Sequence, residues 1–120
     1  MNTILNDFLK AKISLEQLKE KIGNNLYNVI IKTPKIVYAS DLIFLINEYV
    51  SGKISLQEIV DCVNVIWFTD LYEYNMSEED SIASVISLLE TLDEDDVQVS
   101  DKDFIDMIEC LSNNKIYKTS

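Results

Sequence analysis

Carboxylates are the side chains of this protein whose number and spacing could support chemistry. The 120 residues include 21 Asp and Glu and ten Lys, with no Arg and no His. Paired carboxylates can act as acid and base in glycoside hydrolysis, and clustered carboxylates can bind hard cations. Most of the acids fall between residues 58 and 109, so we look for a functional site in that segment.

A cation site is the first possibility to test against the spacing. The acidic run 93–96 could begin a calcium-binding loop, which needs Gly at its sixth position and Glu at its twelfth. Those positions hold Gln98 and Phe104. With no His, and with Cys62 and Cys110 far apart in sequence, a transition-metal site is disfavoured as well. We therefore predict no metal site and no cofactor.

Catalysis is the second possibility. The chain has no nucleophile that could pair with a His base, no Gly-rich phosphate loop and no Arg clamp. We expect no catalytic residue and no enzymatic activity. A hydrolase built from two converging carboxylates stays open as an alternative, and it requires two acids that meet in a pocket.

The charge is distributed very unevenly along the chain. Residues 1–57 carry +2, residues 58–109 carry −15 and residues 110–120 carry +2, for a net charge of −11. Glu78, Glu79 and Asp80 fall in a predicted first helical turn, where the helix dipole favours anions. Glu90 and the run 93–96 fall at a predicted helix C-terminus, where the dipole disfavours them. This placement lowers stability, which suggests that a partner benefits from it.

Four aromatic residues lie within the same segment, between positions 67 and 74. Trp67 continues an apolar helical stripe, and we expect it in the core. Tyr72 and Tyr74 are expected in a loop over 70–77, beside Asp70 and Glu73. Exposed Tyr rings among carboxylates suit a binding hot spot for Lys and Arg, although both rings could instead pack beneath the loop.

A cationic protein surface is therefore the predicted partner of this segment. A solvated acidic face that only aids solubility stays open. Direct nucleic-acid binding is disfavoured, because there is no Arg and the Lys are scattered. The predicted partner-binding residues are Asp70, Tyr72, Glu73, Tyr74, Glu78, Glu79, Asp80, Glu90, Asp93, Glu94, Asp95 and Asp96.

Apolar residues recur with helical spacing along most of the chain. The predicted fold is all-α, a compact antiparallel bundle of five to six helices in a single domain over 1–120, with 113–120 as a frayed tail. The structure of residues 23–39 is left open: the helix that begins at 15 could continue to Ile31, or 29–31 could form a short strand. The predicted helices cover 3–11, 15–22, 41–51, 56–69, 78–92 and 101–112.

The tetrapeptide KISL occurs at 12–15 and again at 53–56. In each copy the Ser is followed three residues later by Gln17 or Glu58, which is the pattern of a capping box. Each copy is therefore predicted to be a helix–turn–helix corner. No apolar run is long enough to span a membrane and the N-terminus lacks signal-peptide features, so a cytoplasmic location is expected.

The stretch FLKAKISLEQLKEKI, followed by a second helical pair and an acidic C-terminal half, resembles bacterial immunity proteins of the colicin D immunity type. It is also similar to helical immunity proteins of contact-dependent growth-inhibition systems. Members of this group are small cytoplasmic helical bundles that bind a nuclease toxin, often a basic tRNA-cleaving domain, and block its active site with acidic side chains.

The resemblance implies that this chain binds and neutralises a cognate toxin, a basic ribonuclease domain. It implies acidic character for the surface, which charge places on 70–80 and 90–96. The alternative is an acidic helical adaptor or nucleic-acid mimic that binds a host nucleic-acid-binding protein.

Overall fold

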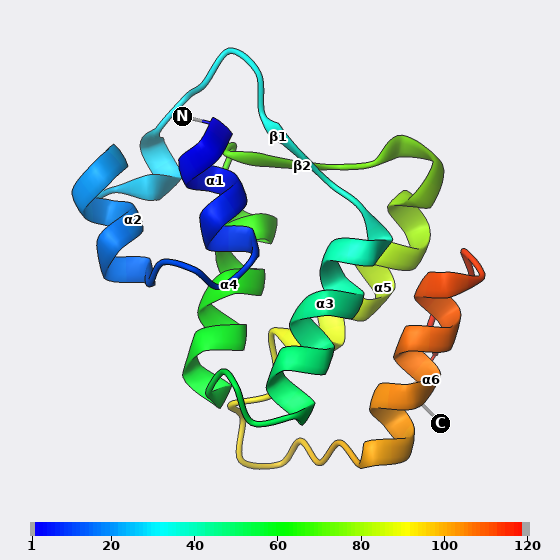
Figure 1. Cartoon of the computed structure of the whole chain (residues 1–120). Coiled ribbons are helices and arrows are strands. Elements are labelled where there is room, and N and C mark those ends of the chain that lie inside the picture. Colours follow the sequence, from blue (N-terminus) through cyan, green and yellow to red (C-terminus); the bar gives the residue numbers. More distant parts are fainter. Residues whose placement is uncertain (1, 119–120) are drawn as a thin grey trace.

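Helices make up most of the protein, as predicted, in a computed structural model that describes residues 2–118 (Figure 1). Two short 3₁₀ helices, η1 (Leu26–Asn28) and η2 (Met76–Glu78), lie between the longer elements. The finer expectation of an antiparallel bundle stays a prediction. Within the described range, no helix has the length and apolar character needed to cross a bilayer. The α-helices are α1 (Asn2–Leu9), α2 (Leu15–Ile22), α3 (Ala39–Val50), α4 (Leu56–Phe68), α5 (Glu79–Leu89) and α6 (Asp101–Ser112).

Two three-residue strands correct the all-α prediction. β1 (Lys35–Val37) and β2 (Tyr72–Tyr74) pair in parallel, with Ile36 opposite Glu73. The expected loop over 70–77 is therefore partly a strand, and the strand in the uncertain region 23–39 lies at 35–37, not at 29–31. Strands this short give too few alternating residues for a sequence pattern to reveal them.

The hydrophobic core surrounds α4. This helix packs against α2, α3, α5 and β2, and α6 covers α3 and α5. Helical spacing directs Ile59, Val63 and Ile66 of α4 into the core, where they are fully buried. Tyr72 of β2 is also buried, and its hydroxyl donates a hydrogen bond of 2.6 Å to the Leu5 carbonyl of α1.

The two KISL corners are confirmed as helix ends joined to capping boxes. Ser14 and Ser55 each accept the backbone N–H of the residue three positions later, and the side chain of that residue accepts the Ser N–H. The preceding helices end with a left-handed residue, Ala11 (φ 59°) in the first corner and Gly52 (φ 80°) in the second. A left-handed Ala is strained by its Cβ, whereas Gly is not.

The segment that follows α6 is ordered, contrary to the expectation of a frayed tail. Asn114 (φ 53°) reverses the chain, and its side chain donates to the Ser77 carbonyl at 2.9 Å. The Tyr117 N–H then donates to Ser84 Oγ at 2.8 Å, so this tail lies along α5. Residues 119 and 120 of the predicted frayed segment lie outside the described residues.

We expect Ala11→Gly to raise the free energy of unfolding by about 1 kcal/mol, because it removes the strain of a left-handed Ala. The matched control is Ala83→Gly, an exposed position inside α5, which should lower it by about 1 kcal/mol. Urea denaturation followed by circular dichroism measures both. If the two variants shift stability in the same direction, the left-handed corner at Ala11 is wrong.

We also expect Tyr72→Phe to lower the free energy of unfolding by about 1 kcal/mol, because it removes the hydrogen bond to Leu5 and keeps the ring. Tyr27→Phe, at an exposed ring, is the control and should change stability very little. The same urea titration compares the two. Equal stability of both variants would argue against the contact between β2 and α1.

Candidate functional site

The structure divides the predicted acidic surface between the two ends of α5. That helix has 11 residues, so its ends are roughly 16 Å apart. β2 leads from the end of α4 to the start of α5, and the 90–100 segment leads from the end of α5 to α6 (Figure 1). We call Asp70, Glu73, Glu79 and Asp80 the β2-end group, and Glu90, Asp93, Glu94, Asp95 and Asp96 the loop group.

Neither group forms an ion pair in the part of the chain that the structure describes. The ion pairs found among residues 2–118 are Lys10–Asp41, Lys53–Glu48 and Lys102–Asp106, and none involves a member of the two groups. All of these nine carboxylates are exposed except Glu90, which is half-buried. Their mutual repulsion therefore acts without a compensating cation within 4 Å in the described chain.

Glu78 has a structural role instead. Its Oε1 accepts the Ala39 N–H at 3.2 Å and the Asn75 side-chain amide at 2.8 Å. Ala39 is the first residue of α3, so the carboxylate satisfies a free helix N–H where the dipole favours an anion. Because its Oε1 is engaged within the protein, we assign Glu78 to the start of α3 and to neither acidic group, and its predicted role in partner binding stays a prediction.

The aromatic part of the prediction needs a larger correction. Tyr72 is buried, because side chains alternate along β2 and this one points into the core, so its ring cannot contact a partner. Burial raises its pKa well above the usual range. Tyr74 is half-buried, and its pKa is raised by burial and then by Glu79. Of the two predicted Tyr residues, only Tyr74 has surface exposed.

Trp67 and Phe68 are instead the exposed aromatic residues of this segment, which sequence reasoning missed. Trp67 is 42% exposed and Phe68 is 50% exposed, and their rings stack with centroids 4.8 Å apart. In the last turn of α4, Val65 and Ile66 already occupy the core side, so the next two residues emerge on the open side. The run of four apolar residues at 65–68, at the end of a predicted helix, was the sequence feature that could have indicated this exposure.

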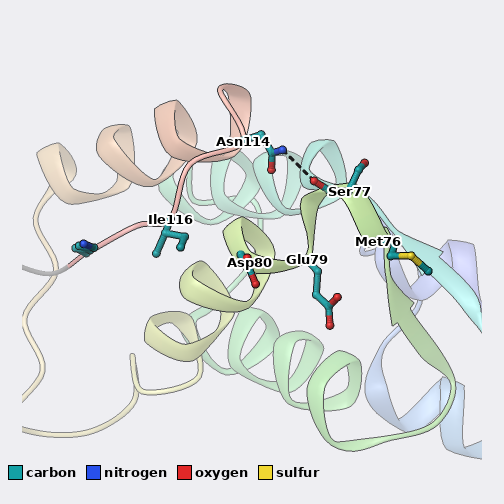
Figure 2. Close-up of a pocket in the computed structure, with 7 residues that line it drawn as sticks. Met76, Ser77, Glu79, Asp80, Asn114 and Ile116 are labelled. Carbon is teal, nitrogen blue, oxygen red and sulfur yellow. Dashed lines mark hydrogen bonds between the residues drawn. The ribbon is translucent and has the colours of Figure 1, made fainter.

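A groove of about 510 Å³ lies between the start of α5 and the tail, and Figure 2 shows the residues that line it. Glu79 and Asp80 line it from α5, while Ile116 and Lys118 line it from the tail. Lys118 brings a positive charge to this groove, although no ion pair forms within 4 Å. The tail therefore moderates the charge beside Glu79 and Asp80, but not beside Asp70 and Glu73.

The loop group follows the C-terminus of α5, where the helix dipole disfavours negative charge. Glu90 is the C-cap of α5, next to the free carbonyls of the helix end. Asp103 in α6 differs, because hydrogen bonds from Ser100 lower the pKa of its carboxyl.

Within residues 2–118, no group of three or more His, Cys, Asp or Glu is arranged to hold a metal ion. The chemistry that these carboxylates offer is attraction of cationic groups.

Comparison of the chain with protein-family models, with curated proteins and with solved structures finds no match. The functional interpretation therefore depends on the residues and the geometry described above.

The helix dipole predicts opposite effects for two neutralising substitutions. Glu90→Gln removes an anion from the C-terminus of α5, and Asp101→Asn removes one from the first turn of α6. Both relieve general repulsion, but the dipole makes Glu90→Gln the more stable variant by about 1 kcal/mol. Thermal unfolding at low ionic strength measures the difference, which should shrink in 1 M salt. A more stable Asp101→Asn variant would contradict the argument.

Proposed function

We propose that this protein is a non-enzymatic immunity protein that neutralises a cognate bacterial toxin in the cytoplasm. The toxin is a basic nuclease domain, most simply a ribonuclease that cleaves tRNA. The protein acts by covering the cationic cleft of that domain with exposed carboxylates, on a support that we expect to be an antiparallel helical bundle.

The observation that carries this proposal is the set of nine carboxylates that form no ion pair within 4 Å among residues 2–118. Between Lys53 and Lys102 the chain has thirteen acids and no Lys. A nuclease must present Lys and Arg around the phosphates of its substrate. Docking of such a surface would supply the missing positive charge, increase the association rate and favour this partner over others.

Charge reversal at each end of α5 tests the proposal. One variant carries Glu73→Lys and Glu79→Lys from the β2-end group, and the other carries Asp93→Lys and Asp95→Lys from the loop group. The probe is the product of the reading frame immediately upstream of the gene, purified as an inactive variant. We expect at least one double variant to raise the Kd about tenfold or more, through a slower association rate.

Thermal stability should hold or rise in the loop-group variant, because it relieves repulsion. In the β2-end variant, the same relief is offset by a Lys in the first turn of α5. The matched control is Glu16→Lys with Glu20→Lys on α2, which changes the net charge equally outside both groups. Co-expression with the active form adds a functional readout, since the wild-type chain should restore growth. Unchanged affinity in both double variants rules out the acidic surface. Binding to a host nucleic-acid-binding protein, without rescue of growth, would instead support the adaptor alternative.

A further inference from the structure

We propose that Trp67 and Phe68 form the apolar anchor of the interface, on which a Lys- or Arg-bearing surface of the toxin docks at the β2 end of the molecule. This inference rests on the proposed function and deepens it, because it assigns contact to one end of α5. The β2-end group then lies in the interface, and the loop group contributes long-range attraction.

Exposure and stacking single out this aromatic pair. The pair has about half its surface exposed, and no other exposed aromatic rings stack on each other within residues 2–118. Trp is among the residues most enriched at interface hot spots, because a large rigid ring buries much area at a low entropic cost. The last turn of α4 holds these rings on a helix whose opposite side is fully buried, so the pair is positioned before a partner arrives.

The charges around the pair determine the kind of partner. Asp70 lies two residues beyond Phe68 and is exposed, and Glu73 is exposed on β2. Trp attracts a cation over its ring face more strongly than Phe or Tyr does, and neighbouring carboxylates add to that attraction. An uncharged apolar partner would remove water from these carboxylates and offer no charge or hydrogen bond in its place. A cationic surface therefore fits better.

Asn64 places an unpaired hydrogen-bond acceptor next to the pair along α4. It lies three residues before Trp67 and four before Phe68, so helical spacing sets it directly beside the pair. Its Oδ1 is buried and has no hydrogen-bond partner in the described chain. Such an unpaired acceptor lowers stability, and an outward rotation of the amide would let an entering Lys or Arg donate to it.

Trp67 is the only tryptophan of the chain, so its fluorescence reports directly on this site. In the free protein, caesium should quench its emission more strongly than iodide does, when each is compared with N-acetyltryptophanamide. The reason is that an anionic environment attracts the cationic quencher. Stronger quenching by iodide would overturn the electrostatic part of the inference without any partner being needed.

The binding test uses the full chain and the inactive product of the upstream reading frame. Trp67→Ala and Phe68→Ala should each raise the Kd at least about tenfold, while Ile105→Ala, at an exposed apolar residue of α6, should leave it within about twofold. Trp67→Phe should retain part of the affinity. Emission of wild-type Trp67 should shift to shorter wavelength in the complex. Circular dichroism and thermal unfolding verify that each variant is folded.

The outcomes separate this inference from the proposed function. If the Ala variants bind as tightly as wild type while acid reversal weakens binding, the anchor is wrong and the immunity function stands. If reversal of the loop group alone weakens binding, contact lies at the other end of α5 and the inference is again wrong. If the wild-type chain does not bind the product, both proposals fail.

Discussion

Repulsion among unneutralised carboxylates is the constraint under which this protein folds. Thirteen acids lie between Lys53 and Lys102 without one intervening Lys, and the described chain supplies no close cation to the two groups at the ends of α5. Burial of apolar side chains around α4 must outweigh this repulsion. The fold reduces repulsion by separating the groups along α5, and by using individual anions at helix N-termini. Glu78 at α3 and Asp103 in the capping box of α6 are examples.

Local signals were sufficient to predict most helices. The capping boxes at Ser14 and Ser55 each involve residues three apart, so the sequence alone predicts them, and the structure has both, with a third at Ser100. The start of α3 was placed two residues late, because the carboxylate of Asp41 accepts the Tyr38 N–H and so caps the helix at an earlier residue. The presence of these helices was therefore predictable, but the side chain that caps the start of α3 was not.

The candidate site was less predictable, because its exposure depends on contacts between distant residues. Tyr72 is buried through a hydrogen bond to Leu5, 67 positions away, and the tail is held by Ser77 and Ser84. Trp67 fits a buried stripe by periodicity, yet it is 42% exposed in the last turn of α4. Charge drew attention to the segment 70–96, whereas the division of its acids between two ends required the direction of α5. A sequence pattern shows neither the contacts between distant residues nor the direction of a helix in space.

The parallel pairing of β1 with β2 has a consequence for the order in which the chain folds. The strands are joined through α3 and α4, so their ladder closes a loop of roughly 34 residues. By the usual loop-closure entropy, joining the ends of such a loop costs about 3 kcal/mol. Two three-residue strands have too few hydrogen bonds to offset that cost alone. The ladder should therefore form only after α3 and α4 have packed, which makes the turn from α4 into β2 one of the last parts of the molecule to take its final shape.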